Sequence, residues 1–148
     1  MTRLRIVAFL FLATLTACAQ NAPVSEAIRK QVAEGTSIKI AELTKFDWDT
    51  FYVFSPYTTK DAVCARLRPM LPECQTTVLA DVDEGTYLLA FSKNGRVVHH
   101  ELYRRGKADF CQMSCVLELS RNQAVFKVSR VATPTGASQT FYLITSAA

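Results

Sequence analysis

One short cluster in the sequence carries side chains with the potential for chemistry. Asp47, Trp48 and Asp49 are consecutive, so an indole stands between two carboxylates. Such a group could hold a cation through its acids or a ligand against the Trp. Calcium takes six to eight oxygen ligands, and no third protein ligand is evident near the pair. A buried Trp with two acids that shape the turn into the next strand explains the cluster more simply, and we favour that interpretation.

The two histidines form a second candidate. His99 and His100 are adjacent, and adjacent residues of a strand point to opposite faces, so the pair is poorly placed to share one metal. Glu101 falls on the same face as His99 and could tune it. The simpler interpretation is that both histidines are solvent-exposed residues of a strand. In addition, no Ser or Cys lies in a nucleophile motif such as G-x-S-x-G. The sequence therefore predicts a non-enzymatic protein with no catalytic residue, metal or cofactor.

Four cysteines lie beyond the N-terminal region, at Cys64, Cys74, Cys111 and Cys115. Neither pair has the C-x2-C spacing of common zinc ribbons, and the C-x3-C of the second pair is not the C-x-x-C of redox enzymes. An even number in an exported chain predicts two disulfides. Three pairings are possible. The local pairing, Cys64–Cys74 and Cys111–Cys115, is favoured because it closes short loops, and a staple between the two segments stays open.

The N-terminus has the features of an export signal. Arg3 and Arg5 precede an apolar run over residues 6–15, which are the basic and apolar regions of a secretory leader. A run of about ten residues is short for a membrane-spanning helix, which needs about 20. An ordinary signal peptide, or an apolar first helix of a soluble protein, would share these features.

The end of this run is more specific, because Leu15, Thr16, Ala17 and Cys18 resemble the lipobox of bacterial lipoproteins. The resemblance implies cleavage after Ala17 and a diacylglyceryl group on the Cys18 thiol. Two or three acyl chains give a lasting membrane anchor, whereas one chain binds only marginally. Ala19 follows the lipidated Cys, which favours the outer membrane and a periplasm-facing domain. In a Gram-positive cell, the same anchor would hold the protein on the outer face of the plasma membrane.

Composition sets the limits of the mature chain. Removal of residues 1–17 from the 148 leaves 131, which suits one domain. The leader holds two of the 17 Lys and Arg and none of the 13 Asp and Glu. The mature chain therefore has 15 basic residues against 13 acids, and its charge gives no support for binding nucleic acid. We expect a leader (1–17), a lipidated tether (18–22) and a single α+β domain (23–148).

The elements that position these residues follow from periodicity and breakers. Asn21 or Ala22 precedes a predicted helix that has Pro23 in its first turn, carries an apolar stripe and ends at Gly35. Thr58 begins a second helix over residues 59–68, which Pro69 ends. Asn94 and Gly95 join two apolar runs and are typical of a hairpin. The predicted strands cover residues 37–43, 51–54, 75–80, 86–91, 96–102, 115–119, 124–131 and 140–145. The fold class is α+β, with a mainly antiparallel sheet of about five to six strands and one or two covering helices.

A small basic patch, Arg104, Arg105 and Lys107, surrounds Gly106. It could meet lipopolysaccharide, anionic lipid or an acidic partner. A solvated hairpin end is the simpler interpretation. We expect five aromatic residues to lie mostly in the core: Phe46, Phe51, Tyr52, Phe54 and Tyr57.

The segment from Phe46 to Thr58 contains Trp48, Asp49, Pro56 and Tyr57 and resembles a family of small exported bacterial proteins with a "WD…PYT" signature. The similarity extends over residues 38–110 and includes Asn94, Gly95 and Arg96. The family has no assigned reaction. The resemblance implies a small secreted α+β domain and no catalytic role.

These observations lead to three functional hypotheses. The first is a non-enzymatic binding lipoprotein whose partner is an envelope or secreted protein, for example an immunity protein against a toxic effector. An exposed edge strand would offer it a docking mode. The second is an envelope assembly or maintenance factor. The third, which we rank last, is an enzyme on envelope substrates that uses Asp47, Asp49 or His99.

Overall fold

The computed structural model describes residues 23–67, 69–78, 80–105, 108–111, 115–131 and 141–146. Residues 1–22, where the sequence predicts a leader and a lipidated tether with Cys18, lie outside the described residues. Within the described part, the chain forms four helices and eight strands. All strand pairs are antiparallel except β5 with β8. The predicted α+β class with mainly antiparallel pairing is confirmed.

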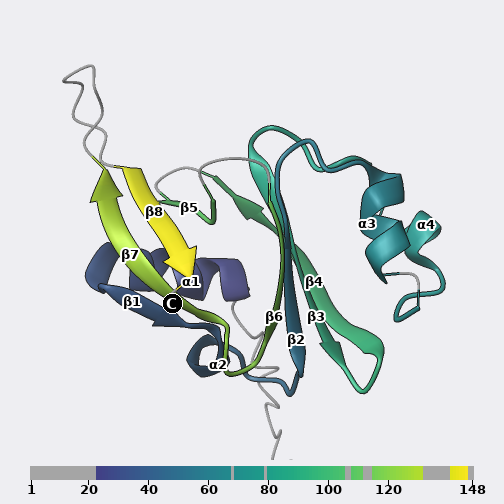
Figure 1. Cartoon of the computed structure of the whole chain (residues 1–148), viewed down its shortest axis with the longest axis horizontal. Helices are drawn as coiled ribbons and strands as arrows, with labels where there is room; N and C mark the ends of the chain where they lie inside the picture. Colours follow the sequence, from purple (N-terminus) through teal and green to yellow (C-terminus); the bar gives the residue numbers. More distant parts are fainter. Residues whose placement is uncertain are drawn as a thin grey trace, which may run out of the picture.

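A central sheet lies in the middle of the molecule (Figure 1). Its order is β4 (Arg96–Arg104), β3 (Thr86–Lys93), β2 (Thr50–Phe54) and β6 (Val116–Ser120). The two middle strands are almost continuously apolar and are buried along most of their length, as strands covered on both faces must be. β4 instead alternates between exposed and partly buried residues, which fits an edge strand.

A second sheet packs against one face of the central sheet. Its order is β1 (Ser37–Lys39), β7 (Val125–Val131), β8 (Phe141–Ser146) and β5 (Ala108–Asp109). The strands thus divide into two sheets of four, where the sequence led us to expect one mainly antiparallel sheet of about five to six strands. The turn after β6 carries the chain from the central sheet to β7, which pairs with the distant β1.

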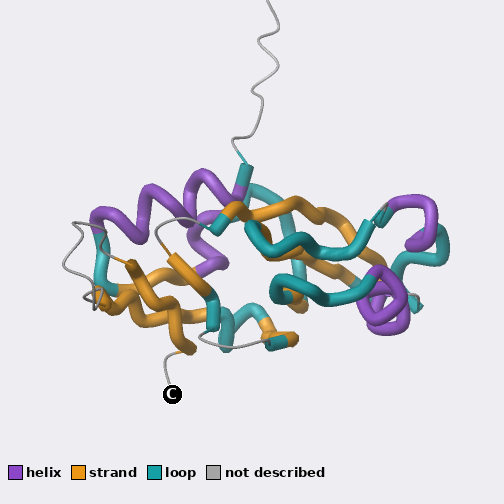
Figure 2. The backbone as a smooth tube through the Cα atoms, turned by 90° about the horizontal axis from the view of Figure 1, so that it is seen from above, coloured by secondary structure: helices purple, strands orange, loops and turns teal. Residues whose placement is uncertain are grey.

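The larger core lies between the two sheets and α1 (Val24–Glu34). In Figure 2, α1 runs along one side of the second sheet. Rings fill the centre of this core: the centroid of Phe91 is 4.8 Å from that of Phe51 and 5.4 Å from that of Trp48, and Phe110 lies 5.4 Å from Phe126. These are favourable edge and tilted separations for aromatic pairs. We call the face of the central sheet that meets this core the inner face.

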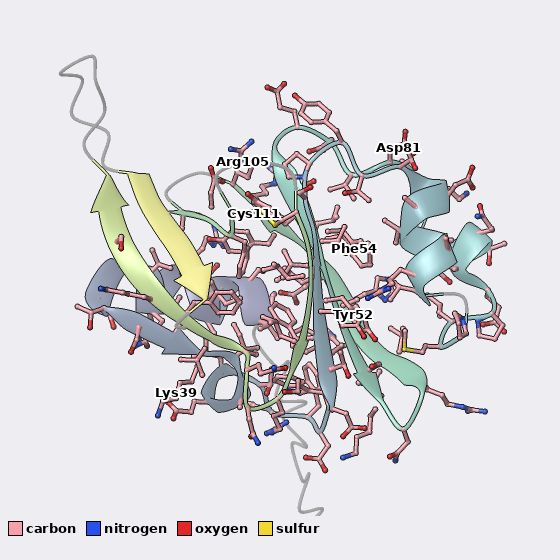
Figure 3. All side chains as sticks on the ribbon, viewed as in Figure 1. Lys39, Tyr52, Phe54, Asp81, Arg105 and Cys111 are labelled. Carbon is pink, nitrogen blue, oxygen red and sulfur yellow. A yellow bond between two sulfur atoms is a disulfide. The ribbon has the colours of Figure 1, made fainter. Side chains whose placement is uncertain are left out.

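The other face of the central sheet, the outer face, is covered by α3 (Lys60–Leu67) and α4 (Cys74–Thr77). Tyr52 and Phe54 point to this side in Figure 3. A disulfide joins Cys64 of α3 to Cys74 of α4, with their Cα atoms 5.5 Å apart, and a second joins Cys111 to Cys115. These are the two local pairs that the sequence favoured.

Two predicted strands were wrong in part. Residues 74–77 form the helical turn α4 instead of the start of a strand, because the Val78 N–H donates to the Cys74 carbonyl and both side chains are buried against the outer face. The strand expected over residues 37–43 stops at Lys39, where α2 (Ile40–Leu43) begins. In both places, tertiary burial overrides a local preference for strand.

The hairpin between β3 and β4 is built as predicted. Asn94 and Gly95 take positive φ values of 49° and 71°, the backbone that a two-residue hairpin loop requires. No described helix is long and apolar enough to cross a membrane.

Candidate functional site

The Trp48 cluster predicted from the sequence serves the core. Trp48 is 1 % exposed, and its indole N–H donates to the Thr44 hydroxyl at 2.8 Å. The guanidinium of Arg121 lies 5.0 Å from the indole centroid and covers the ring from the solvent side. The indole is therefore buried as part of the core, and its ring is not available to a ligand.

The two acids beside Trp48 are not brought together as a site. Both precede β2, which begins at Thr50, and both are exposed. Asp49 Oδ1 accepts from the Lys93 ammonium at 3.1 Å, and its Oδ2 accepts the Asn94 N–H at 2.8 Å. The hydrogen bond from Asn94, followed by that from Lys93, lowers the pKa of Asp49. Asp49 therefore clamps the β3–β4 hairpin turn.

His99 and Glu101 lie on the inner face of β4, and here the sequence interpretation of a shared face holds. His99 Nε2 is 2.8 Å from Glu101 Oε2, and the imidazole lies against Phe46, with ring centroids 4.9 Å apart. The other contacts of Glu101 were not foreseen. The Val24 N–H donates to Glu101 Oε2 at 3.2 Å, and the Ser25 N–H donates to Oε1.

This carboxylate therefore caps α1 from a position 77 residues away in the sequence. The first-turn N–H groups of a helix have no partner within the helix, and the helix dipole favours a negative charge at this end. We call this arrangement the Glu101 clasp. It fixes the start of α1 against β4.

His100 lies on the opposite face, as predicted, and lines an open hollow on the outer side of the central sheet. The hollow has a volume of about 420 Å³, within the range of small ligand-binding clefts. Its apolar residues include Val78, Val82, Leu88 and Leu102, and its polar residues include Asp81, Asp83, Thr86 and His100. The hollow is thus lined by both apolar and polar side chains.

The acids of the hollow already have backbone partners. Asp81, which stands beside the start of α3 (Figure 3), accepts the Lys60 N–H at 2.7 Å. Asp83 Oδ1 accepts the Gly85 N–H and the Thr86 hydroxyl, both at 2.9 Å. These carboxylates hold the loop that forms the wall of the hollow. In the part of the chain that the structure describes, no three His, Cys, Asp or Glu side chains converge as metal ligands do.

The edge of β4 borders this hollow. Arg105 N–H donates to the Gly85 carbonyl at 2.8 Å in line with the β3–β4 register. Peptide groups alternate in direction along an antiparallel strand, so those of Glu101 and Tyr103 face β3 and those of His100, Leu102 and Arg104 face outward. Among the described strands, none pairs with β4 on this side.

The open part of the edge has a defined length. The register shifts between Phe91 and Ser92, which leaves Val98 as an extra residue in β4. Just before this bulge, the Val97 N–H donates to the Met70 carbonyl at 3.0 Å. The edge is therefore covered up to the bulge and open over residues 100–104, a stretch of five residues.

Two of the side chains that flank the open edge are exposed apolar ones. Leu102 is 58 % exposed and Val98 47 % exposed, and Leu102 also lines the hollow. We take the hollow and the open edge of residues 100–104 together as the candidate functional site. The sequence named His100 but not Leu102, and the alternation of β4 was the signal that could have found it.

One residue of the predicted basic patch, Arg105, forms an ion pair with Asp109. Arg105 makes two hydrogen bonds of 2.6 Å to the two oxygens of Asp109, and these bonds raise the pKa of its guanidinium. Figure 3 places Arg105 near Cys111 at one end of the central sheet. Lys107 lies outside the described residues. Arg104 is exposed at the end of β4 and forms no ion pair with a described residue, so its charge is available beside the candidate site.

Tyr57 is the most exposed of the large hydrophobic side chains among the described residues, at 69 %. Its φ of 65° is a left-handed conformation that costs an ordinary residue roughly 1 kcal/mol. Two hydrogen bonds hold it: the Tyr57 N–H donates to the Val82 carbonyl at 2.8 Å, and the Val82 N–H donates to the Thr58 carbonyl at 3.0 Å. These bonds join the loop after β2 to the wall of the hollow.

Comparisons with known proteins add no assignment to this geometry. The chain matches no protein-family model, no curated protein and no solved structure.

Proposed function

We propose that this chain is a lipoprotein, anchored through Cys18, whose domain faces the periplasm and binds another envelope or secreted protein without catalysis. The observation that carries this proposal is the open edge of β4 beside an apolar hollow. Unpaired backbone groups at an edge offer main-chain hydrogen bonds, and an adjacent hollow offers selectivity for side chains. Natural proteins commonly protect such edges, so an open one with exposed apolar neighbours supports a docking role.

The Glu101 clasp adds a spatial argument. Five residues lie between Cys18 and Val24, which makes six steps along the chain, and an extended chain spans at most about 3.5 Å per step. Because Val24 is held on Glu101, a lipid on Cys18 would lie within roughly 20 Å of β4. The proposed docking edge would therefore work close to the membrane surface, within reach of proteins inserted in or lying on that membrane.

The structural roles of the other candidates favour binding over catalysis. Asp49 clamps a turn, Trp48 fills the core and His99 is engaged by the carboxylate of the clasp. Each therefore has a role that needs no substrate. Both versions of the binding hypothesis, immunity and envelope assembly, remain compatible with the proposed site, and the identity of the partner separates them.

The test is capture of a partner by the full chain expressed with its own leader. The tagged chain is purified from membranes, and co-purified proteins are identified and quantified by mass spectrometry. We expect one envelope or secreted protein at near-equal stoichiometry, and an N-terminal peptide that begins at Cys18 with the mass of a diacylglyceryl group. Cys18→Ser is the matched control for the anchor. A well-folded chain that captures no partner would contradict the binding role, and an unmodified Cys18 would contradict the anchor.

A further inference from the structure

We propose that the open edge of β4 binds an extended segment of the partner protein, about five residues long, with an apolar residue at its centre and an acidic residue beside Arg104. The segment adds as a fifth strand to the central sheet. This inference rests on the proposed binding function and deepens it, because it states which atoms dock and which chemistry they select.

The length of the segment follows from the edge itself. The Val97 N–H is taken by the Met70 carbonyl, and Val98 interrupts the register. Docking by main-chain hydrogen bonds can therefore begin only after the bulge. From there, His100, Leu102 and Arg104 present three outward peptide groups, and an added strand of five residues satisfies all three.

The apolar centre follows from Leu102. A neighbouring strand lies about 4.8 Å away, so the residue opposite Leu102 would place its side chain on the outer face against this exposed leucine. Leu88, paired with Leu102 on β3, continues the apolar surface into the hollow. A β-branched or aliphatic side chain at this position buries apolar area that is now exposed to water.

The acidic residue follows from charge. Arg104 is exposed, and among the described residues no acid forms an ion pair with it. The acids of the hollow, Asp81 and Asp83, accept backbone N–H groups and would repel a second acid placed deep inside it. An acid of the partner is therefore favoured at the Arg104 end of the strand, and the hollow itself favours an uncharged residue.

Two capped peptides of palindromic sequence test this chemistry in either strand direction. Glu-Thr-Val-Thr-Glu puts Val opposite Leu102 and an acid opposite Arg104, and Lys-Thr-Val-Thr-Lys is its charge-reversed match. We expect the acidic peptide to bind the detergent-solubilised full chain about two- to fivefold more tightly than the basic one. Arg104→Glu should reverse that order. Methylation of the central Val nitrogen, which removes its hydrogen bond, should abolish binding.

A pair of variants tests the edge in the protein. Leu102→Pro removes an outward N–H without breaking the ladder to β3, because proline is tolerated where the N–H of an edge strand faces solvent. Leu102→Thr keeps the N–H and changes only the side chain. We expect Leu102→Pro to lower capture of the natural partner more than tenfold and Leu102→Thr to lower it less than fivefold.

The outcomes distinguish the two proposals. If the wild-type chain captures a partner that Leu102→Pro, folded by circular dichroism, retains at wild-type level, strand addition is overturned and the binding function stands. If neither peptide binds, or the N-methylated peptide binds as well as its parent, strand addition is also overturned, and this result does not depend on the variants folding. If no partner is captured at all, the binding function itself fails.

Discussion

The Glu101 clasp gives the sharpest prediction about stability. Glu101→Gln keeps the shape of the side chain and one oxygen acceptor but removes the negative charge from the start of α1. The Glu101 side chain is 13 % exposed, so little solvent screens the interaction. A charge at a helix N-terminus contributes about 0.3–1 kcal/mol when exposed and up to about 2 kcal/mol in a partly buried site. We therefore expect the free energy of unfolding to fall by about 1–2 kcal/mol.

Thermal denaturation followed by circular dichroism measures this change. For a domain of this size, 1 kcal/mol shifts Tm by about 3–5 °C, so a loss of about 1–2 kcal/mol in Glu101→Gln should lower Tm by roughly 3–10 °C. Glu42→Gln is the matched control, because Glu42 forms an exposed ion pair with Lys39 and such pairs contribute little. Equal melting of Glu101→Gln and wild type, within about 1 °C, would refute the clasp.

Three further predictions concern other parts of the molecule. Replacement of Cys64 and Cys74 by Ala should lower the free energy of unfolding by about 3 kcal/mol, as expected for a closed loop of about ten residues, and guanidinium titration measures it. In the wild type, ionised Asp49 stabilises the fold above the ordinary Asp pKa of 3.8, and this stabilisation is lost as the pH falls through the lowered pKa of Asp49. Asp49→Asn should lack this contribution, and acid denaturation curves of the two proteins measure the difference. Burial raises the pKa of Tyr103 to about 12. The stabilisation that protonated Tyr103 contributes should therefore be fully present below pH 10 and decline as the pH rises towards 12. Tyr103→Phe should delete the late step in the ultraviolet titration of tyrosine. An unchanged titration would contradict this assignment.

Much of the fold was predictable where local signals agree with burial. Pro23 and Gly35 bracket α1, which begins at Val24 and ends at Glu34, and Asn94 with Gly95 makes the hairpin between β3 and β4. The continuous apolar runs of β2 and β3 became the middle strands of the central sheet. These features depend on residues close together in the chain, so periodicity and turn chemistry suffice to find them.

The division into two sheets was not predictable, because strand order depends on contacts between distant residues. β1 pairs with β7 some 90 residues later, and no local pattern encodes that choice. The turn at α4 was missed for a related reason, since Thr77 and Val78 favour strand and only burial against α3 makes the segment helical.

The candidate site was also only partly predictable, because it too depends on contacts between residues that are distant in the chain. The sequence placed His99 and Glu101 on one face and His100 on the other, as found, but it could not show that Glu101 caps a helix 77 residues earlier. The importance of Leu102 depends on β4 being an edge strand, which is a property of the assembled sheet. The acids around Trp48 were a prominent sequence feature, but Asp49 holds the hairpin turn and Asp47 is exposed.

Residue-resolved hydrogen exchange of β4 tests the central claim most directly. In the free protein, we predict fast exchange at the outward amides of His100, Leu102 and Arg104 and slow exchange at those of Glu101 and Tyr103, which face β3. Binding of the captured partner should slow the three outward amides and leave the other two unchanged. Protection of all five amides in the free protein, or no change at the outward three in the complex, would contradict the account.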